Sequence, residues 1–473
     1  MNGLAQEGMI PMFGIAQYGE AYRSGSLTPN QVIADHIGYA KKVSQKCNAI
    51  SVLNPKAEEL AEASAERFSQ GKVKGPLDGV PVVVKDSYHM KGLKRWHGSA
   101  IHDGDDPSAF SSEPIQKLEA AGAVIVAKTT MPDMGMLGSG ISSQFGIVRN
   151  PWDLSKSPGG SSSGVGASLA SGLAAFGLGT DIAGSVRLPA GHCGLAAIKP
   201  TQERIAYSPA SVMRSSGILS RSISDVEQVL AVVGTSSESD PWSLPGAFEA
   251  KQIGDILARK PKVGLLLDMG YGASLDPVVS SFVVRASERL AQMGCQVEPL
   301  SLDLTDGDFF NADRVFKAHA AAEIRSSRHP EAVLDYVAEW VKEAAELSMA
   351  DYEDAMNGVL STACHVIDET KRFDYLISPV IPVVGFNADI PGPGDDEQLL
   401  HHTQFTAWFN QTCQPAAVYC EGVDQTSKLP VGIQIVAKRF DDAGALAIAG
   451  ALEQSRPETI NYPHFEGVPE YGC

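Results

Sequence analysis

Serine residues among small neighbours are the first candidates for chemistry in this sequence. Ser161, Ser162 and Ser163 stand together, and Ser185 follows within residues 179–187. A serine hydroxyl becomes an effective nucleophile when a nearby base removes its proton. The run from residue 157 to residue 191 contains no histidine, so a base for these serines has to come from another part of the chain.

One interpretation is the nucleophile elbow of α/β-hydrolases, because residues 160–164 read Gly-Ser-Ser-Ser-Gly and satisfy the pattern G-x-S-x-G. That motif requires a strand directly before the serine, and an acid and a histidine later in the chain. The preceding segment contains Asn150-Pro151 and Ser157-Pro158, which are typical of a loop. The elbow, with Ser162 as nucleophile, is therefore disfavoured.

The histidines do not indicate a metal centre. No HExxH pattern occurs among the eleven histidines. The adjacent His401 and His402 would point in different directions on either a strand or a helix, and His192 has no partner at ligand spacing. The sequence predicts ordinary surface or core histidines at these positions and at His89, His97 and His102.

Longer motifs point to a family. Residues 159–164 (GGSSSG) and 179–187 (GTDIAGSVR) closely resemble the defining stretch of the amidase signature family, and residues 79–86 (GVPVVVKD) resemble its lysine motif. The resemblance covers most of the chain, from about residue 30 to residue 453. Further matches, in the family's order, are Lys128-Thr129, Asn150-Pro151-Trp152, Lys199-Pro200-Thr201, Phe373-Asp374-Tyr375 with Pro379, Asn410 with Pro415-Ala416, and residues 429–434.

This resemblance implies a Ser-Ser-Lys arrangement, which needs no histidine. Carried over by motif, Ser185 is the nucleophile, Ser161 the bridging serine after a cis peptide bond, and Lys85 the base. A lysine can act as a base when it is neutral, and burial lowers its pKa. The apolar strand expected at residues 82–84 would carry Lys85 into the interior.

The same resemblance implies that the backbone N–H groups of Ile182, Ala183 and Gly184 form the oxyanion hole. Gly135 matches the loop at the acyl site. Asp181 and Arg187 are interpreted as structural supports that hold this loop by hydrogen bonds.

The chain departs from the family at several positions: Ala183, Ala197 and Cys413 stand where the family usually has glycine, and Thr130 where asparagine is frequent. A left-handed conformation costs alanine about 1 kcal/mol or more. We therefore predict a negative φ at Ala183.

The expected activity is hydrolysis of a small-molecule amide to a carboxylate and ammonia or an amine, through an acyl-enzyme at Ser185 and without a metal or an organic cofactor. Three alternatives stay open: the A-type subunit of a glutamine-dependent amidotransferase, an esterase using the same site, and an inactive binding protein on the same fold. The intact Lys85, Ser161 and Ser185 argue against the last of these.

Composition narrows the partners and the compartment. The formal net charge is −18, and no Lys/Arg-rich run occurs, so direct binding to nucleic acid or to an anionic membrane is not expected. The seven cysteines are scattered without CxxC spacing, which fits a cytoplasmic protein. The start of the chain does not read as a signal peptide, and the Gly/Ser/Ala-rich run is not a membrane span. A homodimer is left open.

The predicted helices and strands alternate, which indicates an α/β fold with a mixed or parallel β-sheet and helices on both faces. The resemblance to the amidase signature family implies an α/β/α sandwich with a large mixed β-sheet covered by helices. We expect one domain over residues 1–473, with N-terminal helices in about 1–70 and a variable helical pocket region in about 313–370. A polar connection is expected over 236–262 and a loop at 391–398. Other predicted helices are 114–121, 163–171, 276–293 and 442–454, and other predicted strands are 122–128, 174–179, 263–267, 295–300 and 429–437.

Overall fold

The computed structural model describes residues 12–207, 210–211, 213–394 and 399–471. An eleven-stranded mixed sheet runs through these residues. Its strands follow one another in the order β1 (Ile50–Leu53), β3 (Val124–Thr129), β2 (Pro81–Lys85), β6 (Phe176–Asp181), β8 (Ser215–Ser220), β7 (Ala196–Lys199), β12 (Ala416–Val423), β13 (Pro430–Ala437), β11 (Tyr375–Pro379), β9 (Lys262–Asp268) and β10 (Gln296–Ser301).

The sheet mixes parallel and antiparallel pairs. Strands β3, β2 and β6 run parallel to one another, as do β11, β9 and β10. The strands between these two groups pair in the antiparallel direction. A separate two-stranded hairpin is formed by β4 (Ile141–Ser142) and β5 (Gly146–Ile147).

Helices cover both faces of the sheet, because alternate residues of a strand point to opposite sides. In β12, Ala417 and Tyr419 belong to one apolar cluster, whereas Val418 belongs to another. The first cluster joins the sheet to α1 (Ile15–Ser24), α4 (Glu113–Ala120), α7 (Ile223–Val233), α8 (Ile253–Leu257), α9 (Pro277–Gln292) and α14 (Asp442–Ser455).

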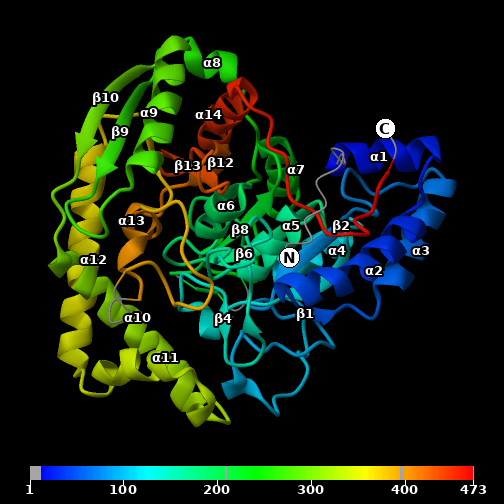
Figure 1. Ribbon diagram of the computed structural model, residues 1–473, viewed down its shortest axis with the longest axis horizontal. Coiled ribbons are helices and arrows are strands. Elements are labelled where there is room, and N and C mark those ends of the chain that lie inside the picture. The colour runs from blue at the N-terminus through cyan, green and yellow to red at the C-terminus, as the bar shows by residue number, and fades with distance from the viewer. Residues whose placement is uncertain (1–11, 208–209, 212, 395–398, 472–473) are drawn as a thin grey trace.

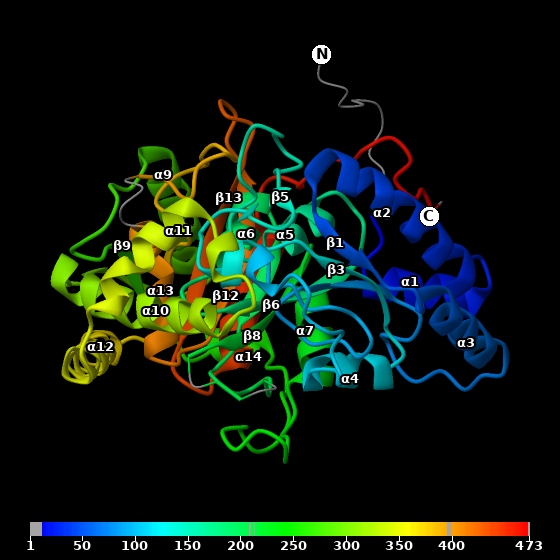
Figure 2. The same cartoon turned by 90° about the horizontal axis from the view of Figure 1, so that it is seen from below.

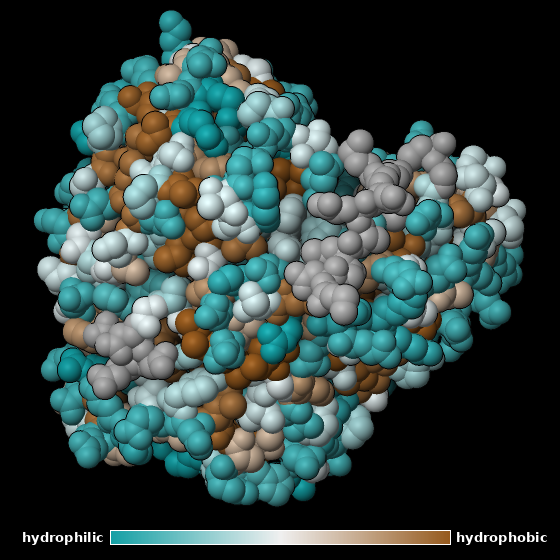
Figure 3. Space-filling model, viewed as in Figure 1, coloured by the Kyte–Doolittle hydropathy of each residue, from teal (hydrophilic) through white to brown (hydrophobic). Residues whose placement is uncertain are grey.

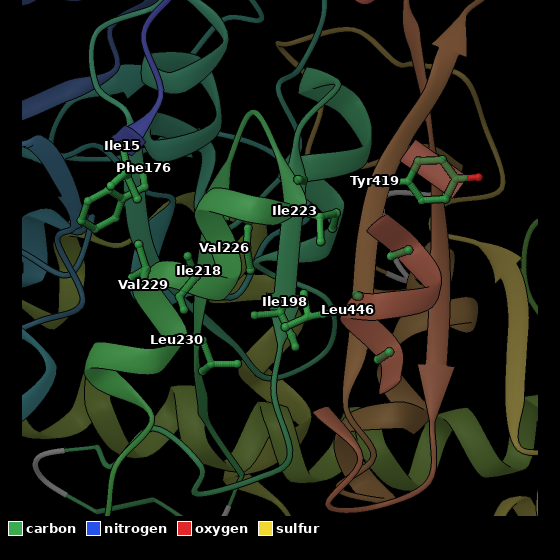
Figure 4. Close-up of a cluster of buried hydrophobic side chains, with 14 of the residues drawn as sticks. Ile15, Phe176, Ile198, Ile218, Ile223, Val226, Val229, Leu230, Tyr419 and Leu446 are labelled. Carbon is green, nitrogen blue, oxygen red and sulfur yellow. The ribbon is translucent and has the colours of Figure 1, made fainter. Parts of the chain in front are cut away.

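Part of this cluster is seen in Figure 4, where Val226 and Val229 of α7 face Phe176 and Ile218 of the strands β6 and β8. The opposite face is covered by α2 (Pro29–Cys47), α5 (Ser163–Ala170), α6 (Arg187–Cys193), α10 (Asp306–Ser326), α11 (Asp335–Trp340), α12 (Met349–Thr370) and α13 (Gln404–Gln411). The predicted sandwich with a large mixed sheet is confirmed.

The two ends of the molecule are helical. Helices α1, α2 and α3 (Ala57–Ser69) lie at one end, and α10, α11 and α12 lie at the other (Figures 1 and 2). Short 3₁₀ helices complete the secondary structure at η1 (Ala100–His102), η2 (Asp133–Gly135), η3 (Pro330–Ala332), η4 (Val341–Ala345) and η5 (His401–Thr403). Hydrophilic residues cover most of the face in Figure 3, with apolar residues scattered between them.

Most predicted elements are present within one or two residues of the expected bounds. The helical region predicted from residue 313 begins earlier, because Thr305 and Asp308 form a capping box that starts α10 at Asp306. The connection predicted at 236–262 contains the short helix α8, in which Ile256 is buried. Half of the loop predicted at 391–398 lies outside the described residues.

Candidate active site

Two neighbouring parallel strands bring the lysine to the site. Val84 of β2 pairs with Leu178 of β6, so Lys85 at the end of β2 lies beside Thr180 near the end of β6. The Lys85 Nζ atom donates to the Thr180 carbonyl oxygen at 3.2 Å and lies 3.1 Å from Thr180 Oγ1. This edge, where parallel strands end together, is a common position for ligand sites in α/β proteins.

Ser161 lies in the loop that leads into α5, and its peptide bond to Gly160 is cis, as the resemblance implied. Its Oγ is 2.8 Å from Lys85 Nζ. Both side chains are buried. The structure therefore places the predicted base and the predicted bridging serine in direct contact.

Ser185 lies in the turn between β6 and α6, and its carbonyl accepts a hydrogen bond from the Ser162 N–H at 3.0 Å. One small cavity is lined by all three predicted catalytic residues, Lys85, Ser161 and Ser185. Its other lining residues are His97, Met131, Met134, Gly135, Met136, Thr180, Ile182 and Arg214. The three residues, which lie far apart in the sequence, thus meet at one cavity.

The nucleophile elbow needs a strand directly before its serine, but loop residues precede Ser162. The Ser162 side chain is also fully buried. Ser162 is also absent from the residues that line the cavity. These observations agree with the choice of Ser185 over Ser162.

The environment of Lys85 favours its neutral form. Burial lowers the pKa of Lys85, and the positive charge of Arg214 lowers it further, while Asp181 acts in the opposite direction. The pKa lies well below the usual value of 10.5. An amine with a lowered pKa can accept a proton from the neighbouring serine near neutral pH.

The turn between Asp181 and Arg187 presents free backbone donors. The Gly184 N–H donates to Asp181 Oδ1 at 2.7 Å. In the described part of the chain, no acceptor is found for the N–H groups of Ile182, Ala183 and Ser185. Of the three donors predicted from the sequence, two are therefore available, and the third already has a partner. The Ser185 N–H is a candidate that the sequence reasoning missed.

The backbone of this turn explains the glycine at position 184. Gly184 has a φ of 124°, and a Cβ there would lie 2.3 Å from Thr406 Oγ1. Ala183 is not among the described non-glycine residues with positive φ, so the predicted negative φ is confirmed. Its carbonyl accepts a hydrogen bond from Thr406 Oγ1 at 2.6 Å.

Asp181 and Arg187 form an ion pair and hydrogen bonds that fix the turn. Both are fully buried, and Arg187 Nη2 lies 3.0 Å from Asp181 Oδ1. The same carboxylate accepts from the N–H groups of Gly184 and Val186 and from Asn410 Nδ2. Burial raises the pKa of Asp181, but Arg187 and these hydrogen bonds outweigh that effect and hold it well below its usual range.

Gly135 lines the same cavity as Ile182 and Ser185 of the turn. It has a φ of 73°, and a Cβ at this position would come within 3.1 Å of Ser161 Oγ. A side chain here would be strained and would crowd the bridging serine. The structure thus places Gly135 beside the predicted catalytic group.

Six residues that line the cavity were not among the predicted site residues: His97, Met131, Met134, Met136, Thr180 and Arg214. Thr180 belongs to the motif at 179–187, so its position in the motif was a usable signal. His97 and Arg214 carry no such signal, since each reaches the cavity from a segment with no recognised motif. His97 Nδ1 contacts Glu323 Oε1, which also accepts from His102 Nε2 at 3.1 Å.

These two histidines and Glu323 form a group that could hold a metal ion, within the described residues. Sequence spacing could not indicate it, because Glu323 lies more than 200 positions away from both histidines. The hydrogen bonds among the three side chains, and one from His102 to Asp105, account for their arrangement without an ion.

Comparison with known proteins identifies the family. A model of the Amidase family matches residues 31–446, and the chain belongs to the amidase signature family. The chain is 30% identical to the putative amidase AmiB2 of Mycobacterium bovis, over 94% of this chain and 96% of that protein. It is 28% identical to the A-type subunit of the glutamyl-tRNA(Gln) amidotransferase of Bdellovibrio bacteriovorus, over 95% of this chain and 98% of that protein.

A solved structure has the same fold. A bacterial aryl acylamidase of the amidase signature family superimposes with a TM-score of 0.84 at 22% identity, over 95% of this chain and 97% of that chain. No helix in the described part of the chain combines the length and the apolar character that a membrane crossing demands.

Proposed function

We propose that this chain hydrolyses a linear carboxylic amide to a carboxylate and ammonia or an amine, through an acyl-enzyme at Ser185. The observation that carries the proposal is the 2.8 Å contact between Lys85 Nζ and Ser161 Oγ in the cavity that Ser185 also lines. Family membership supports an amide hydrolase. We assign the base to Lys85, the proton bridge to Ser161 and the nucleophile to Ser185.

Acylation begins with a relay of two protons. Ser161 gives its hydroxyl proton to neutral Lys85 and takes the proton of Ser185, whose oxygen attacks the amide carbon. The carbonyl oxygen gains a negative charge and is stabilised by the free N–H groups of Ile182, Ala183 and Ser185. Such donors contribute about 3 kcal/mol each in comparable sites.

The relay then runs backwards to complete the reaction. Lys85 returns its proton through Ser161 to the departing nitrogen, so that ammonia or an amine leaves and an ester to Ser185 remains. A water molecule, deprotonated by the same relay, attacks this ester and releases the carboxylate. Lys85 and both serines end in their starting protonation states.

A second candidate function is the A-type subunit of a glutamine-dependent amidotransferase, because relatives with that name cover nearly the whole chain. Such a protein would work with partner chains on a transfer-RNA-linked substrate. An esterase using the same serine is chemically close to both. The scattered cysteines, with no disulfide among the described residues, suit a cytoplasmic location for either function.

The test is an activity screen of the purified chain alone, over aliphatic, aryl and peptide-like amides with the corresponding esters as comparison. We expect amide turnover without any added protein. Release of ammonia from glutamine that depends on added partner proteins would favour the amidotransferase instead. Cleavage of esters with no amide turnover would favour the esterase.

A further inference from the structure

A second cavity adjoins the one that contains Ser185. It has a volume of about 210 Å³ and is lined by Ser87, His89, Arg95, Tyr207, Ala210, Ser211 and Arg214. Arg214 also lines the cavity of Ser185. Because Arg214 lines both cavities, the second one, here called the arginine pocket, lies next to the cavity of Ser185.

The arginine pocket is positively charged in a strongly acidic chain. Its lining contains two arginines and no Asp or Glu, although the formal net charge of the whole chain is −18. Within the residues that the structure describes, neither Arg95 nor Arg214 forms a salt bridge with a carboxylate. The sequence from residue 204 to residue 221 has no acidic residue either.

The polar contacts of the two guanidinium groups leave donors unused. Arg95 Nε donates to the Ser87 carbonyl at 2.8 Å. Arg214 has its Cζ 5.8 Å from the centre of the Tyr207 ring, and its side chain is also hydrogen-bonded to Tyr207. Glu323 is a carboxylate whose charge acts on Arg214, but its Oε1 already accepts from His97 and His102.

Two half-buried guanidinium groups that form no salt bridge have donors available for an anionic ligand. Guanidinium donors also match the planar geometry of a carboxylate, which they bind by two parallel hydrogen bonds. A carboxylate on the substrate would supply a salt-bridge partner.

We propose that the arginine pocket binds the carboxylate of a substrate that carries its amide at the other end, so that the preferred substrates are monoamides of dicarboxylic acids. The proposal rests on the proposed function of Ser185. Ser185 attacks the amide carbon, Arg95 and Arg214 hold the distal carboxylate, and water and the monoamide yield a dicarboxylate and ammonia. The pocket thus determines specificity and takes no part in the bond-breaking step.

Arg95 is the better residue for a test, because Arg214 also lowers the pKa of Lys85 and its loss would change turnover of every substrate. The purified full chain is assayed with succinamate, glutaramate and adipamate, and with the matching neutral diamides. We expect kcat/KM for at least one monoamide to exceed that for its diamide by about tenfold or more, as hydrogen bonds to a charged group allow.

In Arg95→Gln this preference should fall by about tenfold, through a higher KM for the monoamide, and Arg95→Lys should recover part of it. Arg439→Gln, at an exposed position outside the lining of both cavities, is the matched control. A wild-type enzyme that favours the diamides, or a preference that Arg95→Gln leaves unchanged, would overturn the proposal.

A binding measurement keeps the two proposals separate. Ser185→Ala cannot turn over substrate, so calorimetric titration with succinate, glutarate and adipate reports the pocket alone. We expect one of them to bind, and Arg95→Gln in the same background to abolish binding. No binding of any dicarboxylate would overturn the arginine pocket, whereas binding without amide turnover in the wild type would count against the proposed function only.

Discussion

At the scale of single residues, the proposed mechanism requires Lys85, the proposed base, to be neutral. Its Nζ lies within 3.2 Å of Ser161 Oγ and of both oxygen atoms of Thr180. No carboxylate makes a salt bridge with it among the described residues. These three polar, uncharged contacts satisfy the amine without fixing a proton on it.

The pH dependence of activity follows from the lowered pKa of Lys85. In the proposed mechanism the neutral form of Lys85 is the active one, so kcat/KM should rise with pH through the pKa of Lys85, at a pH well below the usual 10.5. Lys85→Ala should lose turnover by a factor of about 100 or more. Lys85→Arg should be equally inactive, because a guanidinium stays protonated. Near-normal rates in Lys85→Ala would show that another group is the base.

Ala183 offers a sharper test of the turn geometry. Because its φ is not positive and its N–H is free, Ala183→Gly should keep most of the activity. Ala183→Val should crowd a position that is 3% exposed and misplace the donors, with a loss of about 100-fold in kcat. Equal activity of the two variants, measured at saturating substrate, would contradict the assignment of this turn to the proposed oxyanion hole.

At the residue scale, motifs carried the information, and the catalytic roles assigned from them stay predictions. Lys85, Ser161 and Ser185 were identified from three short strings, and the structure brings them to one cavity. Arg214 and His97 were missed because tertiary packing brings them to that cavity and no recognised sequence pattern marks them. The Gly184 N–H was predicted as a free donor, and its bond to Asp181 could be seen only in three dimensions.

At the scale of elements, the site depends on the junction of β6 and α6, where one carboxylate organises the whole turn. Asp181 accepts from two backbone N–H groups, from Arg187 and from Asn410. Arg187 in turn donates to the Thr406 carbonyl and to Gln434 of β13. The turn is thereby fixed to α13 and to the middle of the sheet.

Breaking this network should cost stability as well as activity. Asp181→Asn removes the charge opposite the buried Arg187 and turns an acceptor into a donor, which should lower the free energy of unfolding by about 3 kcal/mol. Urea denaturation measures the loss. Lys371→Gln, in an exposed pair with Asp368, is the control and should leave the midpoint unchanged. A wild-type midpoint for Asp181→Asn would show that the turn is held by other contacts.

Elements with strong local signals were predicted well, and the others were not. Strand β2 follows from a run of valines, and α2 from Thr28 as N-cap and Pro29 at its first turn. The short helix α8 was missed, because five residues carry too little periodicity to be recognised. The order of the eleven strands was beyond the sequence, since it depends on pairing between distant segments.

At the scale of the whole molecule, the sheet joins both halves of the chain. Strand β1 of the N-terminal part forms one edge, and β10 of the later part forms the other. That residues 1–473 form one domain stays a prediction, and it implies a single calorimetric unfolding transition. Two separate transitions, one of which leaves the N-terminal helices folded, would contradict it.

Covalent labelling of Ser185 tests the central claim most directly. A serine-directed phosphonofluoridate is incubated with the purified chain, and the modified peptide is identified by mass spectrometry, with turnover measured in parallel. We predict one phosphonyl group per chain, on Ser185, with complete loss of amide hydrolysis, and no labelling of Ser185→Ala. Labelling of Ser162 instead, or full turnover by Ser185→Ala, would contradict the proposed acyl-enzyme.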